Sequence, residues 1–318
     1  MVTMKILVGA AIAAVVLAAA PSAFSDDTRI FTLTDPRGDD HGDGSLVYPR
    51  RDDLKPGDLD LLSLTAKRQS DGTWFEATFA RPIMPTNRRV IDAGGGSLDD
   101  IARYNFYTFN IDIYIDTDRV PGSGMNYMLP GRKAEIDPAN AWEKAICLTP
   151  RPREARQAVG RMIAGYAWKD AKARGEKLDA VKRKQILADI NRDIDKQIFF
   201  PTQIHVLGSK IGFLVPLSFL NGWAKPEWSY VVAVSGADVY QKLDLGGLLN
   251  IAADVPDSLY ILGVEPGSSS TERFGGGDED NPNQPPLVDI IVPPGLKQED
   301  VLKSQPVRLP GVVPKDVK

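Results

Sequence analysis

The chain has 318 residues, of which 43% are hydrophobic and 25% are charged, and its formal net charge is −4. This length supports one large or two small domains with a sizeable core. The acidic balance argues against nucleic-acid binding, because a phosphate backbone requires a basic surface and the one basic segment lacks a groove-reading motif. Cys147 is the single cysteine, which excludes an intramolecular disulfide, and with two histidines it leaves too few ligands for a typical zinc cage.

The first 25 residues have the pattern of a secretory signal peptide. Lys5 opens a short basic region, residues 6–20 form an apolar run, and Ala23 and Ser25 offer small residues for cleavage. The alternative is an uncleaved anchor, but fifteen apolar residues are short for a bilayer, which needs about 20. We therefore predict a signal peptide over residues 1–25, a mature chain without a transmembrane segment, and a periplasmic or secreted location.

Residues 35–60 form an unusually acidic loop between two strand-like runs, at 30–34 and 59–66. The loop holds eight Asp, four Gly and three Pro. So much negative charge must be held by a cation or by backbone donors, and Ca²⁺ prefers carboxylate oxygens on permissive, Gly-containing backbone. The alternative is that these side chains cap turns without metal. We predict a Ca²⁺ site with four ligands, namely Asp35, Asp39, Asp40 and Asp60.

Alternating apolar residues predict strands in much of the remaining chain. Residues 73–80 alternate, and so do residues 104–117, where Phe109 and Ile111 share one face with further apolar residues. The opposite face carries Asn110, Asp112, Tyr114 and Asp116, which predicts an antiparallel sheet with one solvated side. Further strand candidates, separated by turn residues, lie at 126–129, 143–148, 203–207, 212–216, 229–235 and 260–264. The pattern favours an all-β antiparallel sandwich over residues 26–292.

Residues 153–199 interrupt this pattern with helical spacing and predict an inserted α-helical hairpin. Residues 151–196 carry 13 Lys or Arg against 7 Asp or Glu, a net charge of +6. The simpler interpretation is a solvated outer face, and the sharper one is a contact site for an acidic polymer or protein. Residues 293–318 are Pro-rich, and we expect a mobile tail with one helical turn at 298–303.

Exposed aromatic rings would indicate sugar binding, because pyranose faces stack on Trp and Tyr. The candidates are Trp74, Tyr114, Trp223 and Trp228. Trp74 and Tyr114 fall on the polar faces of their strands and are the expected exposed platforms, whereas the other two flank a loop; core packing is the alternative for each. Asp112 and Asp116 are paired as in glycosidases, but nothing else supports catalysis, so we predict no enzymatic activity.

Several sequence blocks together resemble a known family. The first is D-P-x-G-D-D-x-G-x-G-x-x-x-Y-P from Asp35 to Pro49. Later blocks follow in the same order: P-G-x-x-D-L at 56–61, D-I-Y-I-D-T-D at 112–118, L-P-G-R at 129–132, R-F-G-G-G at 273–277 and V-D-I-I at 288–291. This ordered set resembles the C-terminal binding module of bacterial glucodextranase, also found at the end of archaeal amylopullulanases.

The resemblance implies a DOMON-like, jelly-roll-type sandwich and noncatalytic binding of polysaccharide or cell-envelope glycan. Relative to the family pattern the helical hairpin is an insertion. Haem-carrying relatives in the DOMON-like class leave Met125 and Met128 as candidates for an axial sulfur ligand. We therefore expect an exported glycan-binding module stabilised by Ca²⁺, and the alternative is an interaction subunit that docks a protein partner through the basic hairpin.

Overall fold

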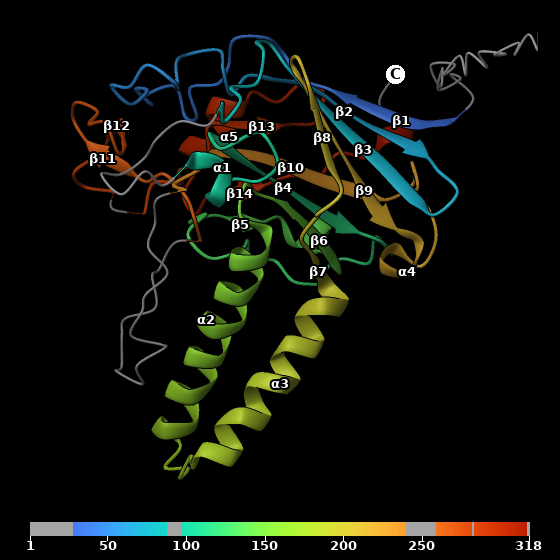
Figure 1. The fold of residues 1–318 in the computed structure, drawn as a ribbon, viewed down its shortest axis with the longest axis vertical. Coiled ribbons are helices and arrows are strands. Elements are labelled where there is room, and N and C mark those ends of the chain that lie inside the picture. The colour runs from blue at the N-terminus through green and yellow to red at the C-terminus, as the bar shows by residue number, and fades with distance from the viewer. Residues whose placement is uncertain (1–27, 88–96, 240–258, 282, 317–318) are drawn as a thin grey trace, which may run out of the picture.

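The computed structural model describes residues 28–87, 97–239, 259–281 and 283–316, so the signal peptide predicted over 1–25 lies outside the described residues. Two five-stranded sheets form a sandwich (Figure 1). The first sheet has the order β1 (Arg29–Thr34), β2 (Leu61–Arg68), β3 (Gly72–Phe79), β9 (Lys210–Pro216) and β8 (Ile204–Leu207). The second has the order β13 (Asp289–Ile291), β10 (Ser229–Gly236), β4 (Phe109–Asp116), β6 (Lys144–Leu148) and β7 (Ile198–Phe199). The predicted β-sandwich with a helical insertion is confirmed.

Smaller elements complete the fold. Two parallel strand pairs lie outside the main sheets, β11 (Val264–Pro266) with β12 (Phe274–Gly277) and β14 (Arg308–Leu309) with β5 (Glu135–Ile136). Two long helices are α2 (Pro152–Ala173) and α3 (Ala180–Gln197). Single helical turns are α1 (Leu98–Ile101), η2 (Pro138–Asn140), α4 (Leu217–Leu220) and η4 (Pro314–Asp316), and α5 (Gln298–Lys303) is slightly longer.

The main core lies between the two sheets and follows from the alternation of apolar residues along the strands. Phe75 and Phe79 on β3 point inward and meet inward residues of β4 such as Phe109. The rings of Phe79 and Phe109 approach to 4.7 Å between centroids, and those of Phe75 and Phe213 are stacked at 5.8 Å. Removal of this apolar area from water is the dominant force that holds the sandwich together.

The opposite face of β4 is buried, so the prediction of a solvated side on this strand is wrong. Every residue of β4 is buried, including Asn110, Asp112 and Asp116. A second apolar cluster covers this face, in which Tyr114 packs with Trp142 and with residues of α2 such as Val159. The polar side chains on β4 therefore face a covering layer, where they need hydrogen-bond partners rather than water.

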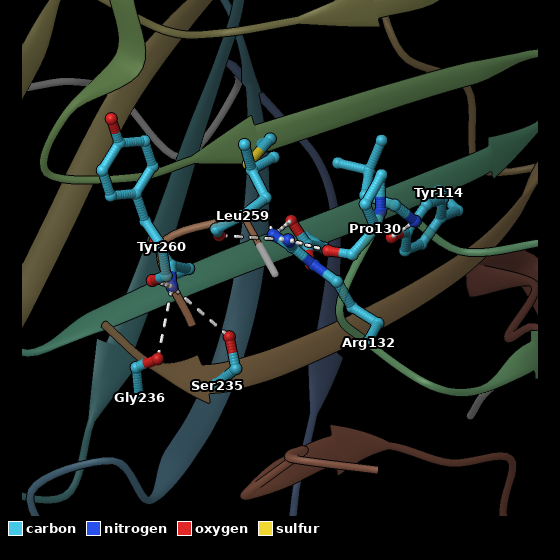
Figure 2. A network of polar contacts seen from close by, with 11 residues as sticks. Tyr114, Pro130, Arg132, Ser235, Gly236, Leu259 and Tyr260 are labelled. Carbon is cyan, nitrogen blue, oxygen red and sulfur yellow. Dashed lines mark hydrogen bonds and ion pairs between the residues drawn. The ribbon is translucent and has the colours of Figure 1, made fainter. Parts of the chain in front are cut away.

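Arg132 supplies the partner of one of these buried carboxylates (Figure 2). Its Nε and Nη2 donate to the two oxygens of Asp112 at 2.6 and 2.9 Å, and Nη1 donates to the carbonyls of Pro130 and Leu259. Arg132 is fully buried, so the bidentate pair and the two carbonyls together offset the desolvation of its charge. At Asp112, the polar position in the alternating pattern of β4 is therefore part of a buried ion pair and does not face water.

The helical hairpin predicted at 153–199 is present as α2 and α3, inserted between β6 and β7. At its base Ala155 and Val159 are buried against the second sheet, and Arg156 joins the two helices through Asp195 and Asn191. The distal part projects away from the sandwich (Figure 1). Among the helices that the structure describes, none has the length and apolar character needed to cross a membrane.

The C-terminal segment packs on the sandwich, so the prediction of a mobile tail over 293–318 is wrong for its described part. The helical turn expected at 298–303 is present as α5, and β14 pairs with β5. Leu309 is buried, and Val312 exchanges two backbone hydrogen bonds with Tyr230 at 2.8 and 2.9 Å. The apolar residues scattered between the prolines cover the second sheet, and this contact fixes the segment.

Candidate functional site

The acidic loop folds against the start of β13, which belongs to the opposite sheet from β1 and β2. Gly42 lies at the contact, with a positive φ of 59°, and its N–H donates to the Val288 carbonyl at 2.8 Å. A Cβ on this residue would lie 2.7 Å from the Leu287 carbonyl oxygen, so only glycine fits without a shift. This close approach brings the loop carboxylates next to Asp289.

Three carboxylates meet at this contact. One oxygen from each of Asp35, Asp39 and Asp289 lies within 4.8 Å of the other two. Asp60 is their neighbour and accepts a hydrogen bond from the Gly38 N–H at 2.9 Å. Asp289 is 0% exposed, and its Oδ2 accepts from the Leu61 N–H at 2.6 Å. The four side chains come from the ends of β1, β2 and β13 and from the loop itself.

Several oxygens of this cluster are buried and have no hydrogen-bond partner among the described residues. They are both oxygens of Asp35 and the Oδ1 atoms of Asp39, Asp60 and Asp289. A buried carboxylate oxygen without a donor loses its hydration and gains nothing in return. The described residues therefore supply too few hydrogen-bond donors and positive charges to balance these carboxylates.

The pKa values of these carboxyl groups are raised for the same reason, because burial and neighbouring negative charges disfavour their ionised forms. Burial raises the pKa of Asp35 to about 8; the Asp289 side chain partly opposes this rise, and the charges of Asp39 and Asp60 add to it. Burial and the charges of neighbouring carboxylates raise the pKa of Asp39 to about 6, and burial raises the pKa of Asp60. Burial raises the pKa of Asp289 well above its ordinary value of 3.8, and Asp35 adds to the shift. Protons or a cation must neutralise the group near neutral pH.

The structure brings two of the four predicted metal ligands, Asp35 and Asp39, together with Asp289, and the charge of Asp60 acts on Asp35 from close by. Asp40 lies outside the group of three, and its Oδ2 accepts hydrogen bonds from the Tyr48 hydroxyl and from the Gly57 N–H, the latter at 2.6 Å. Through these two hydrogen bonds Asp40 holds the loop in shape. Sequence reasoning missed Asp289, although a lone Asp in the apolar run 288–291 signals a buried carboxylate that needs a partner.

The outer face of the first sheet is solvated, as the alternating burial of β3 shows. Its inward residues are buried, whereas Trp74, Glu76 and Thr78 on the outer face are half-buried. Trp74 lies opposite Lys67 on β2, and Glu76 lies opposite Gly212 on β9. This half-exposed outer face is therefore a candidate surface for a ligand.

Trp74 lies over Gly212 on this face. A Cβ at Gly212 would overlap the six-membered ring of the indole, and it would lie 2.7 Å from the indole nitrogen. The ring of His205 approaches Trp74 edge-on, with the centroids 5.5 Å apart. The missing side chain of Gly212 lets the indole lie against the sheet, which gives a flat apolar platform on a polar face.

Polar groups border this platform. Glu76 forms ion pairs with Lys67 at 3.2 Å and with Lys210 at 3.1 Å. Burial opposes the ionisation of Glu76, but the hydrogen bonds from Lys210 and Lys67 lower its pKa overall. The three side chains place donors and acceptors beside the Trp74 ring, the combination that sugar hydroxyls require.

The other predicted sugar-stacking residues differ in exposure. Tyr114 is only 1% exposed, and its ring lies 5.5 Å from that of Trp142, so its expected role as an exposed platform is wrong. Trp228 is also buried, with Lys225 above its ring. Trp223 follows α4 and is 36% exposed. Its Nε1 donates to the carbonyl of Gln69 in the β2–β3 turn at 2.9 Å.

Two hollows, with volumes of about 470 and 560 Å³, are lined in whole or in part by residues of the acidic loop. Both are lined by Arg51 and Asp52, and the larger also by Asp238 and Glu272. The one aromatic ring at the smaller hollow, Tyr48, is buried and bonded to Asp40. The hollows therefore have no exposed aromatic ring among their lining residues.

Comparison with known proteins places the chain in one family. The family model for the C-terminal, SLH-like binding module of glucodextranase matches residues 30–309, which is nearly the whole chain. A search of curated proteins finds no match. The matched segment contains both sheets, the acidic loop, the helical hairpin and β13. The chain therefore belongs to the family of C-terminal, SLH-like binding modules of glucodextranase.

Proposed function

We propose that this protein is an exported, noncatalytic module that binds carbohydrate or cell-envelope glycan on the outer face of its first sheet. The observation that carries the proposal is the Trp74 indole lying over Gly212 on a solvated polar face. Membership of a binding-module family supports a binding rather than a catalytic role.

The chemistry of this face suits a pyranose. The apolar face of a sugar ring stacks on the indole of Trp74, while Lys67, Glu76 and Lys210 exchange hydrogen bonds with its hydroxyls. Trp223 lies at the end of the same sheet, with the Arg68 guanidinium 4.6 Å from its ring centroid. It is the candidate for a second contact with a longer chain.

Affinity electrophoresis in gels that contain α-glucan or envelope polysaccharide tests the proposal. We expect the mature chain to be retarded, and Trp74→Ala to remove most of the retardation. Tyr166→Ala is a matched control, because Tyr166 is 53% exposed on the distant hairpin. The proposal fails if no polysaccharide retards the mature chain, or if Trp74→Ala binds as the wild type does.

We also propose that Ca²⁺ binds between Asp35, Asp39, Asp60 and Asp289. The buried oxygens without partners support this site, since Ca²⁺ takes six to eight oxygen ligands and carries the missing positive charge. Asp35 and Asp60 adjoin strands of the first sheet, and Asp289 opens β13 of the second. A cation here would join the two sheets at one edge of the sandwich.

Export to the periplasm or the medium remains our proposal from the leader predicted over 1–25. Cell fractionation with a tag after Lys318 tests it. We expect the tagged chain outside the cytoplasm and shortened by the leader, and an unprocessed cytoplasmic chain would contradict the proposal.

A second candidate function is protein docking through the hairpin. Its net charge of +6 over residues 151–196, its projection beyond the sandwich (Figure 1), and its exposed Tyr166 and Val181 support an acidic protein partner. Charge reversal at three exposed lysines, Lys169, Lys172 and Lys184, should then abolish capture of that partner from an envelope extract. Capture that survives the reversal, or that depends equally on Trp74, would argue against docking by the hairpin.

A further inference from the structure

A second group of carboxylates lies at the end of β4, on the sheet opposite the Trp74 face. Asp116 ends β4, Asp118 follows in the next loop, and Glu143 directly precedes β6. The antiparallel pairing of Ile115 with Lys144 places these ends side by side. One oxygen from each of the three carboxylates lies within 4.8 Å of the other two.

Asp116 is the residue that points to a ligand. Its side chain is 1% exposed, and its Oδ1 accepts from the N–H groups of Asp118 and Arg119 at 3.2 and 2.5 Å. Its Oδ2 is buried and has no hydrogen-bond partner among the described residues. A buried carboxylate oxygen without a donor, next to two more carboxylates, is costly unless a cation meets it.

The neighbouring loop already orients the other two carboxylates. Glu143 accepts from the Thr117 N–H at 2.7 Å, and Asp118 accepts from the Val120 N–H at 2.8 Å. The Ser123 hydroxyl contacts both, at 2.9 Å from Asp118 and 3.2 Å from Glu143. Asp118 is exposed and Glu143 is half-buried, so water can reach the group from one side.

The ligand atoms decide which ion fits. All three side chains offer hard carboxylate oxygens, which favour Ca²⁺ or Mg²⁺ over metals that prefer nitrogen or sulfur. Mg²⁺ demands a near-ideal octahedron and usually keeps several waters beside one or two carboxylates, whereas Ca²⁺ accepts six to eight oxygens in flexible geometry, so a group of three carboxylates favours Ca²⁺.

We infer that Asp116, Asp118 and Glu143 form a second Ca²⁺ site, independent of the cluster at Asp35 and Asp289. The ion would close the loop at residues 117–124 onto the start of β6. Beyond this loop Tyr127 is exposed beside Trp142, with the ring centroids 6.2 Å apart. The site would therefore fix a part of the surface that lies away from the Trp74 platform.

Calorimetric titration of chelator-treated protein with Ca²⁺ tests this inference. We expect Asp118→Asn/Glu143→Gln to bind one Ca²⁺ equivalent fewer than the wild type. Both side chains reach solvent, and their amides still accept the loop hydrogen bonds, so this variant should fold; far-UV circular dichroism checks it. If the folded variant binds as many equivalents as the wild type, or the wild type binds none, the inference is wrong.

A second variant separates the two sites. Asp35→Asn/Asp39→Asn should lose the first site only, so the remaining equivalent belongs to the group at Asp116. If the first site does not exist, this variant should match the wild type while Asp118→Asn/Glu143→Gln still loses its equivalent.

Trypsin cleavage after Arg119 reports locally on the loop at residues 117–124. A chelator should speed this cleavage in the wild type but not in Asp118→Asn/Glu143→Gln. Cleavage that ignores Ca²⁺ in the wild type would overturn the inference.

Discussion

Asp35 and Asp289 meet at one edge of the sandwich, although Asp35 follows the first described strand and Asp289 opens one of the last. Their carboxylate oxygens lie within 4.8 Å of each other, and both residues carry oxygens without a hydrogen-bond partner among the described residues. Two buried carboxylates at this separation repel each other unless protons or a cation lie between them. The free energy of unfolding should therefore depend on Ca²⁺ concentration and on pH through this contact.

Added Ca²⁺ should raise the melting temperature in a concentration-dependent way. A ligand that binds only the native state stabilises it by RT ln(1 + [L]/Kd), about 2.7 kcal/mol at 100 times the Kd. Differential scanning fluorimetry with added Ca²⁺ or a chelator measures the shift. The test is run in the Asp118→Asn/Glu143→Gln background, and there Asp35→Asn/Asp39→Asn should remove the response. A melting temperature indifferent to Ca²⁺ in that background would contradict the first site.

Without Ca²⁺, stability should fall as the pH rises from about 4 to 8. The pKa of Asp35 is raised from 3.8 to about 8 and that of Asp39 to about 6, so the native state binds more protons than the unfolded state over this range. The free energy of unfolding then decreases with pH, and the decrease ends above the folded pKa values. Urea unfolding in chelator at pH 5 and pH 8 measures it. Asp35→Asn/Asp39→Asn should flatten the profile, and a rise in stability between these pH values would contradict the assignment.

Gly212→Ala should weaken glycan binding more than it weakens the fold. The new Cβ would displace the end of the Trp74 side chain, which can move outward, so the platform changes while the sheet remains. Tryptophan fluorescence reports the displacement, and affinity electrophoresis reports the binding. Gly165→Ala in α2 is the matched control, because a Cβ there meets nothing within 4 Å. Unchanged retardation by Gly212→Ala would argue against the platform.

Removal of one partner of the buried pair should destabilise the protein strongly. Arg132→Met leaves the Asp112 carboxylate buried without its bidentate donor, which costs about 3–5 kcal/mol. Asp112→Leu/Arg132→Met removes both charges and should recover much of this loss. Urea unfolding at neutral pH measures both changes. A single variant as stable as the wild type would show that water reaches the pair.

Much of the fold could be predicted from local patterns. The two-residue alternation at 73–80 and 104–117 indicated β3 and β4, and the helical spacing at 153–199 indicated α2 and α3. These periods reflect side-chain geometry along one element, so a short window is enough to detect them. The family blocks placed the acidic loop and the strand at 288–291 in one module before any contact between them was known.

Other features depended on contacts that no local window contains. The polar face of β4 looked solvated because alternation does not distinguish water from a buried partner, and that partner, Arg132, comes from a distant loop. The same limit affected Tyr114, which is covered by Trp142. The segment after residue 292 looked mobile because its apolar residues are scattered. In the structure Leu309 and Val312 are nevertheless buried against the sandwich.

The sequence by itself determined the main strands, such as β3 and β4, together with the inserted hairpin, the family and the acidic character of the loop at 35–60, because each depends on adjacent or regularly spaced residues. Only the tertiary structure decided that Asp289 joins Asp35 and Asp39, that Asp40 bonds Tyr48 and the Gly57 N–H, and that Tyr114 is buried whereas Trp74 is half-buried on the outer face. The physical reason is that desolvation and charge repulsion depend on which groups lie close together in space. Contacts between residues far apart in the sequence cannot be read from a local pattern.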